Sequence, residues 1–370
     1  MKILVLAQTP PPVHGQSLMV RAMVDGLPRL GIEVRHVPVE LSKTHDDIGK
    51  WRPGKAIAAI RAGLAARRIG RAEAFDALYY VPAPGKRGAL WRDLIILGLA
   101  RPAFRRMVLH WHAPGLGTWL EKRATGPERI AARRFLGRAE LSIVLADTLR
   151  HDAQMLGAKR IAIVPNGVPD PGPPERRPAA PGRPWQVLFL GQCSEEKGLF
   201  AAAEAVIAAN AKDRQTPGQP GYTLVAAGPF PRPSDERAFA ALAGRHPGVV
   251  RHVGEVSGES KRSVFLESDC LCLPTRYPHE GQPLVVLEAL AFDLPVVATP
   301  WRAIAGTLPP EAGALVPPGD SGALAETLRA IRAKPPGPGV ARAAYLREFT
   351  QELHLKRLAS ELLRMIDSGP

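Results

Sequence analysis

Two carboxylates, Glu280 and Glu288, bracket an apolar stretch in the segment HEGQPLVVLEALA, residues 279–291. The stretch is typical of a half-buried helix, and Gly281 and Pro283 favour a tight entry into it, because proline is tolerated in a first turn. The carboxylates lie eight residues apart. This offset slightly exceeds two helical turns, so both can face one cleft if Glu280 immediately precedes the helix. A surface helix with a capping carboxylate is the alternative.

Two loops have the composition of phosphate-binding turns. Gly15, in QTPPPVHGQS (8–17), precedes an expected helix whose first N–H groups lack intrahelical partners. Lys197, in FLGQCSEEKG (189–198), occupies the equivalent place in the second half of the chain. A cation there opposes the helix dipole unless an anion is bound. An ordinary strand–helix turn and a solvated lysine are the alternatives.

Two histidines, His110 and His112, lie at the end of an expected strand in LHWHA. Side chains two residues apart share one face of a strand. We expect His112 to act in a cleft, with a core histidine as the alternative. No third ligand follows at a spacing typical of zinc. Cys270 and Cys272, which alternate in DCLCLP, are expected in a core strand.

Several motifs of other enzyme classes are missing. No Asp-x-Asp stretch occurs, so we expect no metal or other cofactor, and phosphate charge must be met by lysine, arginine and helix N-termini. The chain has no Walker A loop, no Gly-x-Gly-x-x-Gly after its first strand and no Gly-x-Ser-x-Gly elbow. These absences argue against an NTPase, a nicotinamide enzyme and a hydrolase of the elbow type.

The elements that must position these residues alternate between strands and helices. At 370 residues the chain is too long for one ordinary core, so two domains are expected. Apolar strand-length runs separated by helical patterns predict parallel sheets with covered faces, an α/β fold. We expect a first Rossmann-like domain over 1–168, a proline-rich linker over 169–184 and a second Rossmann-like domain over 185–345. Ligands of such sheets bind at the carboxyl ends of the strands, here in a cleft between the domains.

The net charge of +14 is distributed unevenly: residues 1–170 hold 27 Lys and Arg against 14 Asp and Glu, whereas residues 171–370 hold 22 against 21. The excess in the first half indicates an acidic partner there. The stretches 57–71 and 90–106, which include Arg67, Arg68, Arg105 and Arg106, resemble basic amphipathic helices that lie on anionic membranes. An arginine-rich solvated surface is the alternative. The first residues, MKILVLAQTPPP, favour a buried strand over a signal peptide, and we expect no membrane-spanning segment. We therefore expect a cytoplasmic protein on the inner face of the plasma membrane.

Taken together, the motifs resemble those of the family-4 retaining glycosyltransferases, which have the GT-B fold. The matches run nearly the full length of the chain: PPPVHG, HWHAPG, VPNGV, FLGQCSEEKG, VAAGP, HVGEV, the Glu-x7-Glu pair in PTRYPHEGQPLVVLEALA, DLPVVAT and GALVPPGDSGALA. The resemblance implies transfer of a sugar from a nucleotide diphosphate sugar to an acceptor with retention of configuration. It also implies that a helix over about 350–370 packs back on the first domain. A GT-B sugar-nucleotide epimerase and an inactive nucleotide-sugar-binding module are the alternatives.

The resemblance also implies roles for single residues. Glu280 accepts hydrogen bonds from the donor sugar, Glu288 accepts them from the ribose, and His112 lies beside the reacting carbon. Val256 borders the base. The remaining implied residues hold the diphosphate or approach it: Gly15, Gln192, Lys197, Gly281, Gln282 and Leu284. The implied partners are a nucleotide sugar and a glycan or lipid-linked acceptor of the cell envelope or an exopolysaccharide, with no nucleic acid.

Two positions depart from the family pattern. Gln192 stands where the family usually has arginine, five residues before Lys197, and a neutral amide donates a hydrogen bond without supplying charge. Arg276 is the nearest candidate to compensate. Pro283 stands where a glycine is frequent, which removes one backbone N–H donor.

Overall fold

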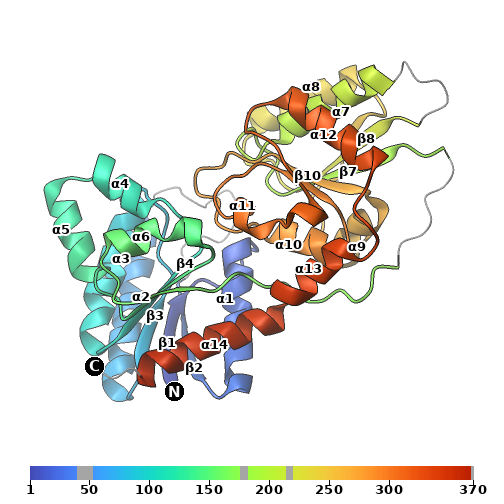
Figure 1. The fold of residues 1–370 in the computed structure, drawn as a ribbon. Coiled ribbons are helices and arrows are strands. Elements are labelled where there is room, and N and C mark those ends of the chain that lie inside the picture. Colours follow the sequence, from blue (N-terminus) through green and yellow to red (C-terminus); the bar gives the residue numbers. More distant parts are fainter. Residues whose placement is uncertain (40–52, 176–181, 214–219, 368–370) are drawn as a thin grey trace. The chain divides into compact units, whose positions relative to one another are not determined.

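The computed structural model describes residues 1–39, 53–175, 182–213 and 220–367, which form two compact units (Figure 1). The first unit comprises Met1–Gly167, His279–Gln282 and Gln351–Pro370, and the second comprises Val168–Pro278 and Pro283–Thr350. Part of the predicted linker, 176–181, lies outside the described residues. The segment His279–Gln282 is grouped with the first unit, although it lies within the 185–345 range predicted for the second domain.

The first unit is built on a six-stranded parallel sheet in the order β2-β1-β3-β4-β5-β6. Apolar residues occupy both faces of the inner strands, as in parallel sheets covered by helices on each side. Ile3 and Val5 of β1 pack against the helices of one face, and Leu4 and Leu6 are equally buried. The strands are β1 (Lys2–Ala7), β2 (Glu33–Pro38), β3 (Ala77–Tyr80), β4 (Met107–Trp111), β5 (Leu141–Val144) and β6 (Ile161–Ile163).

Helices cover both faces of this sheet. The C-terminal helix α14 (Gln351–Asp367) contributes Leu358, Leu362 and Met365 to the core that β1 and helix α1 (Gly15–Gly26) share, and Figure 1 shows α14 near α1. The long helix α2 (Pro53–Ala72) packs along α3 (Arg87–Ala100). The other helices are η1 (Leu27–Leu30), η3 (Arg101–Ala103), α4 (Leu116–Lys122), α5 (Gly126–Phe135), η4 (Asp147–Leu149) and α6 (His151–Met155).

The second unit has its own six-stranded parallel sheet, in the order β12-β11-β10-β7-β8-β9. Its central strand β10 carries Cys270 and Cys272, which are fully buried as the sequence predicts. The strands are β7 (Trp185–Leu190), β8 (Tyr222–Ala227), β9 (Val250–His252), β10 (Cys270–Leu273), β11 (Val296–Ala298) and β12 (Gly313–Leu315). The helices are α7 (Leu199–Asp213), α8 (Pro233–Arg245), α9 (Gly258–Glu267), α10 (Leu284–Ala291), α11 (Ile304–Thr307), η5 (Pro310–Ala312), α12 (Ser321–Ala333) and α13 (Val340–Glu348).

The predicted α/β class with two parallel sheets is confirmed. The sequence analysis did not identify β5 or β12, or the short helices α4, α5 and α6. β5 has four residues and β12 has three, and an apolar run of that length lacks the periodicity that separates a strand from a buried turn.

The two basic stretches predicted to face a membrane differ in what they expose. On α2, Ile57, Ile60 and Leu64 are 52%, 42% and 48% exposed, and their spacing places them on one helix face. On α3, in contrast, the apolar residues Leu90, Leu94, Ile96, Leu97 and Ala100 are buried in the unit, and Trp91 is the large apolar side chain left exposed. The prediction of an outward apolar face over 90–106 is therefore wrong. Within the described residues, no helix is both long and apolar enough to cross a membrane.

Candidate active site

In the first unit, the loop that carries Glu280 lies directly against the end of β4. A Cβ atom placed on Gly281 would lie 2.0 Å from the carbonyl oxygen of His112. That distance is far below any contact a side chain can make, so only glycine fits. Glu280 itself is 6% exposed and His112 is 8% exposed. The structure therefore brings the predicted carboxylate loop and the predicted histidine together in one buried place.

Two further contacts hold this loop. The ring of His279 contacts the Pro114 carbonyl oxygen through Nδ1 at 3.1 Å. The Gln282 side-chain oxygen accepts from the Asn166 backbone N–H at 2.6 Å, and the Gln282 carbonyl accepts from the Asn166 side chain at 3.2 Å. The side chain of Gln282 is thus engaged within the protein, so a role in holding a diphosphate falls to its backbone.

A buried histidine cluster surrounds His112. The rings of His110 and His112 lie 4.1 Å apart, and His354 of α14 stacks near His110 at 6.3 Å. Burial lowers the pKa of His112 to about 3, with the neighbouring His354 and His14 acting in the same direction. Burial also lowers the pKa of His354 to about 4 and that of His110 well below its usual value. At neutral pH these rings are uncharged.

Hydrogen bonds fix the orientation of this cluster. The Tyr79 hydroxyl lies 2.5 Å from His110 Nδ1, and His354 Nδ1 contacts the Pro165 carbonyl oxygen at 2.7 Å. The following loop is also anchored, because the Asp152 carboxylate accepts from the backbone N–H groups of Gly115 and Gly117 at 2.8 and 2.7 Å. The end of β4 is therefore a rigid platform.

The predicted Gly15 opens helix α1. His14 is the N-cap: its Nδ1 accepts from the Ser17 backbone N–H at 3.3 Å, and the Ser17 hydroxyl accepts from the His14 N–H at 3.0 Å. Gly15 is exposed at the first helical position, where a backbone N–H has no intrahelical partner. The cap residue His14 was missed in the sequence analysis.

In the second unit, three glycine-bearing loops meet after β7, β8 and β9. A Cβ atom on Gly228 would lie 1.9 Å from the Gly191 carbonyl oxygen, and the Gly228 N–H donates to the Gly254 carbonyl at 2.8 Å. Gly228 also has a φ of +128°, a conformation that side chains rarely adopt. The motifs FLGQ, VAAGP and HVGEV thus converge through their backbones, and Val256 follows as a half-buried residue against this unit's core.

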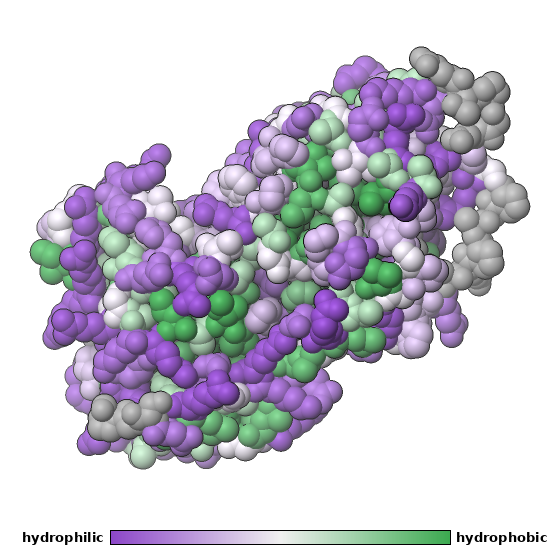
Figure 2. Space-filling model, viewed as in Figure 1, coloured by the Kyte–Doolittle hydropathy of each residue, from purple (hydrophilic) through white to green (hydrophobic). Residues whose placement is uncertain are grey.

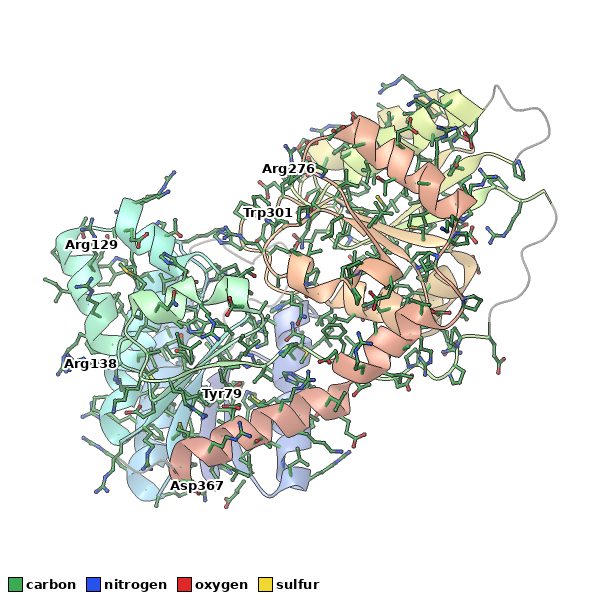
Figure 3. All side chains as sticks on the ribbon, in the orientation of Figure 1. Tyr79, Arg129, Arg138, Arg276, Trp301 and Asp367 are labelled. Carbon is green, nitrogen blue, oxygen red and sulfur yellow. The ribbon has the colours of Figure 1, made fainter. Side chains whose placement is uncertain are left out.

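Gln192 and Lys197 lie on the first of these loops. The Lys197 ammonium lies 4.9 Å from the ring centre of Tyr277. The turn after it requires glycine, because Gly198 has a φ of +86° and its Cβ would lie 2.4 Å from the Pro274 carbonyl oxygen. Arg276, labelled in Figure 3, is paired with Glu195 at 3.0 Å. An exposed pair of this kind contributes little, so Arg276 stays available for an anion.

Glu288 lies on α10 and is paired with a residue that the sequence analysis missed. Its Oε1 accepts from Lys261 Nζ of α9 at 2.6 Å. Within the described part of the chain its Oε2 has no hydrogen-bond partner. Leu284 is the first residue of α10, with Pro283 as N-cap, so the helix begins with unpaired N–H groups. Glu280 and Glu288 fall in different units.

Among the described residues, no group of three or more His, Cys, Asp or Glu side chains is arranged to hold a metal ion. The cluster of His110, His112 and His354 is joined by ring contacts and by hydrogen bonds to Tyr79 and a backbone carbonyl. In the described part of the chain, the Nε2 atoms of His110 and His354 are buried without a hydrogen-bond partner.

Comparison with known proteins shows what this chain is similar to. Residues 184–333 match the family model described as glycosyl transferases group 1. The phosphatidyl-myo-inositol mannosyltransferase of Mycobacterium leprae is 29% identical over 256 residues, which cover 60% of this chain and 63% of that protein. Other curated relatives are named glycosyltransferases of colanic acid, teichuronic acid and amylovoran biosynthesis. The aligned stretches cover 46% to 63% of the relatives' own lengths.

Solved structures extend the likeness over the whole chain. Sucrose-phosphate synthase from Thermosynechococcus elongatus superposes with a TM-score of 0.74 at 19% identity, over 100% of both chains. Anabaena Alr3699/HepE in complex with UDP and glucose superposes with a TM-score of 0.68 at 17% identity, over 98% of this chain and 99% of that one. The chain has the GT-B fold, as the resemblance of its motifs implies.

Proposed function

We propose that this protein is a family-4 retaining glycosyltransferase that moves a sugar from a nucleotide diphosphate sugar to an acceptor without a metal ion. The observation that carries the proposal is the seating of Gly281 on the His112 carbonyl, which sets Glu280 beside an uncharged, buried histidine. The group 1 match over 184–333 and the glycosyltransferase relatives support the class of reaction.

The proposed reaction requires stabilisation of the positive charge that develops on the transferred sugar. As the bond to the diphosphate breaks, positive charge develops on the sugar ring, and preorganised oxygen atoms stabilise it. The His112 carbonyl and the Glu280 carboxylate supply such oxygens. A protonated imidazole beside this carbon would oppose the reaction, and burial keeps His112 neutral. The acceptor attacks on the face that the diphosphate leaves, and a diphosphate oxygen takes its proton.

The departing diphosphate is held by backbone N–H groups and cations. We assign this role to Lys197, Gln192 and the backbone at Gly281, Gln282 and Leu284, with Gly15 allowing close approach of the first loop. Glu288 binds the ribose through Oε2, while Lys261 holds Oε1. Val256 borders the base. HepE, which is recorded with UDP and with UDP-glucose, supports a uridine donor as the first candidate.

Incubation with a panel of UDP-, GDP-, ADP- and dTDP-sugars tests this function. Slow release of free sugar from one donor, with its anomeric configuration retained, is the expected result. Epimerisation without an acceptor supports the epimerase alternative, and binding without turnover supports an inactive module. The reaction should run fully in EDTA, because the chain lacks the Asp-x-Asp stretch that holds a metal–diphosphate complex. Activity that magnesium or manganese restores after EDTA would overturn the metal-free mechanism.

The acceptor is proposed to be a lipid-linked sugar or a growing glycan of the cell envelope or an exopolysaccharide, reached at the inner face of the plasma membrane. The outer face of α2 supports this location: Ile57, Ile60 and Leu64 are exposed there, beside the exposed Arg61 and Arg68. Apolar side chains bordered by arginine fit an anionic bilayer. The relative that acts as a phosphatidyl-myo-inositol mannosyltransferase supports a lipid acceptor.

Sedimentation with phosphatidylglycerol and phosphatidylcholine vesicles tests the location. Binding should require the anionic lipid, fall with salt and weaken when Ile57, Ile60 and Leu64 become serine. A matched control replaces Ile163, Leu346 and Leu363, which are exposed on other elements. Equal binding by both variants, or indifference to lipid charge, favours a soluble acceptor and an arginine-rich solvated surface.

A further inference from the structure

A basic cavity lies at the amino ends of strands of the first unit's sheet, whereas His112 lies at the carboxyl end of β4. It has a volume of about 800 Å³ and is lined by the residues that precede three strands. Arg101 and Phe104 precede β4, Gly137 and Arg138 precede β5, and Met155 to Gly157 precede β6. The residues proposed to bind the donor follow the carboxyl ends of strands, whereas this cavity lies at amino ends. The cavity is therefore separate from the proposed donor site.

Four arginines line the cavity: Arg101, Arg133, Arg134 and Arg138. None of the described residues that line it is acidic. In the part of the chain that the structure describes, Arg133, Arg134 and Arg138 form no salt bridge with a carboxylate. Arg133 and Arg134 lie in the last turn of α5, where the carbonyl end of the helix offsets part of their positive charge. Like charges around one cavity still repel one another, and a bound anion lowers that repulsion.

The cavity is held in shape without a ligand. Arg101 donates to the carbonyl oxygens of Arg134 and Phe135 at 3.2 and 2.8 Å, which ties the end of α3 to the end of α5. A Cβ atom on Gly137 would lie 2.2 Å from the Arg133 carbonyl oxygen, and Arg138 follows with a φ of +56°. This tight turn sets Arg138 beside the end of α5. In Figure 3, Arg138 is labelled on the same unit as Arg129 of α5.

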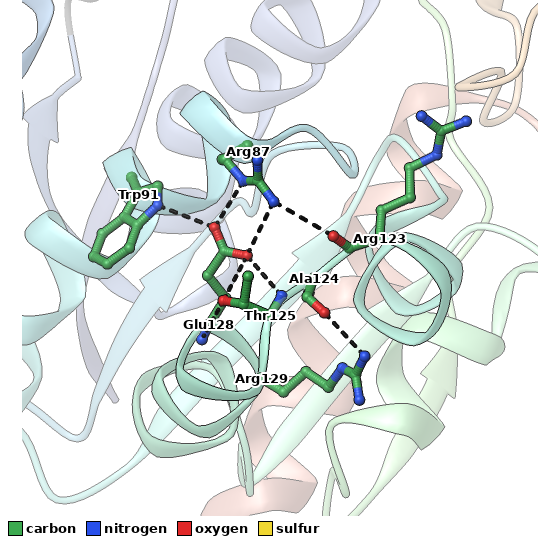
Figure 4. Close-up of polar contacts among 7 residues, drawn as sticks. All are labelled: Arg87, Trp91, Arg123, Ala124, Thr125, Glu128 and Arg129. Atoms are coloured by element: carbon green, nitrogen blue, oxygen red, sulfur yellow. Dashed lines mark hydrogen bonds and ion pairs between the residues drawn. The ribbon is translucent and has the colours of Figure 1, made fainter.

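The other end of α5 is fixed by a buried carboxylate (Figure 4). Glu128 completes a capping box with Thr125 and accepts from Arg87 Nε at 2.9 Å and from Trp91 Nε1 at 3.3 Å. Arg129 donates to the Ala124 and Leu120 carbonyls at 2.9 Å. Two arginines of the cavity are thus carried on a helix whose backbone is held at both ends, so a ligand has to order their exposed side chains but not the helix that carries them.

The chemistry of the lining indicates the ligand. One planar guanidinium group can donate two parallel hydrogen bonds to two oxygens of the same phosphate group. Apolar side chains lie beside them: Phe104 and Phe135 line the cavity, and Ile130 is 72% exposed at its border. Figure 2 shows apolar groups bordered by strongly hydrophilic residues on this unit. We propose that this cavity is a second anion site, distinct from the donor site, that binds the phosphate group of an amphipathic molecule.

Phosphate binding tests the site. The probe is inorganic phosphate, titrated against chloride at equal ionic strength and followed by calorimetry. All proteins carry Lys197→Gln, which removes the cation proposed for the donor diphosphate. The test variant changes Arg133, Arg134 and Arg138 to glutamine. The control variant changes Arg29, Arg35 and Arg237, three exposed arginines for which the described residues likewise provide no salt bridge, so the loss of charge is the same.

The test variant should bind phosphate at least tenfold more weakly than the control. Equal binding by the two variants, or no phosphate binding by the control, overturns the proposal. Phosphatidylglycerol vesicles then separate two sources of the phosphate: weaker vesicle binding by the test variant identifies a lipid headgroup, and equal vesicle binding identifies a soluble phosphorylated ligand. If the triple variant does not fold, Arg134→Gln and Arg138→Gln are tested singly.

Discussion

At the carboxyl ends of its strands the first unit gathers buried, uncharged side chains, whereas the second gathers glycines and paired charges. His110, His112 and His354 lie away from solvent with lowered pKa values. Lys197, by contrast, lies over an aromatic ring, and Lys261 is paired with Glu288. Both units use the same sheet edge of a similar fold. The difference indicates that one edge suits a reaction that needs a dry, neutral surrounding, and the other suits a ligand that carries charge.

The largest effect is expected from Glu280→Gln in the first unit. Loss of one preorganised group that stabilises developing charge lowers turnover by about 10²–10³-fold. Turnover with the best nucleotide sugar should fall by that factor, while the unfolding midpoint stays close to that of the parent. Glu267→Gln, at an exposed position of α9, is the control and should leave turnover unchanged. A folded Glu280→Gln protein with normal turnover contradicts the assignment of the carboxylate.

A second expectation concerns the contact that seats the carboxylate loop. Gly281→Ala places a methyl group where the His112 carbonyl lies 2.0 Å away, so the loop must shift. Overpacking of this kind costs about 1–3 kcal/mol, and turnover should fall with it. The control is Gly244→Ala in α8, where a Cβ meets nothing within 4 Å. That change should raise stability by about 0.5–1 kcal/mol. Equal unfolding free energies for the two variants would show that the close approach is absent in solution.

A third expectation uses the histidines to separate the units by pH. The folded-state pKa values of about 3 for His112 and about 4 for His354 lie below the ordinary value of 6.5. The unfolded chain therefore binds protons that the folded chain does not. Stability is complete above pH 6.5 and is lost as the pH falls. At pH 5 each of these two histidines lowers the free energy of unfolding by ~2 kcal/mol relative to its value at neutral pH.

Hydrogen exchange measures this loss unit by unit. Amides of β1 and β4 should lose protection between pH 7 and pH 5, after correction for intrinsic exchange rates, more than amides of β7 and β10. The variant His354→Gln should remove part of the pH dependence, whereas His246→Gln in the second unit should not. If the protection of both sheets changed equally with pH, the histidine cluster of the first unit would be accessible to water and its pKa values would not be lowered by burial.

The smallest effect is expected from Gln192→Arg in the second unit. A restored guanidinium adds a charge-assisted hydrogen bond to the diphosphate, and at the lower end of the usual range this contributes about 1.5 kcal/mol, or roughly tenfold in affinity. Thermal shift with the best donor gives the change in affinity. In parallel, Arg276→Gln should weaken donor binding if Arg276 already compensates. Unchanged affinity in both variants would mean that this loop does not contact the diphosphate.

The sequence predicted the elements whose apolar runs are long and the loops whose residue types are distinctive. The strand containing KILVLA and the helix that begins near Glu280 were both foreseeable, because burial on a parallel sheet demands a continuous apolar run. β5 was missed because LSIV is too short to show a period. The reasoning from Gly281 foresaw a tight entry to a helix. It did not foresee the His112 carbonyl, because a contact between residues 169 positions apart leaves no local pattern.

The supporting residues were missed for a similar reason. Each of them is an ordinary polar residue in its own segment of the sequence. Only the fold brings Lys261 to Glu288, Asn166 to Gln282 and His354 to His110. The prediction that 90–106 exposes an apolar face failed because the sequence of this helix is compatible with two orientations: leucines turned outward to a membrane, or leucines turned inward to the core. Packing against α2 and α5 selects the one that buries the leucines.

The return of α14 to the first unit has a consequence for how the protein is made. Leu358, Leu362 and Met365 complete a core whose other residues begin at Ile3, so nearly the whole chain must leave the ribosome before that core can close. The second unit is continuous except for four residues and is available to fold earlier. We therefore expect the usual order, in which the amino-terminal domain folds first during synthesis, to be reversed. A chain that ends before α14, for example after a premature stop codon, is accordingly expected to have a folded second unit and a first unit that is open to proteolysis.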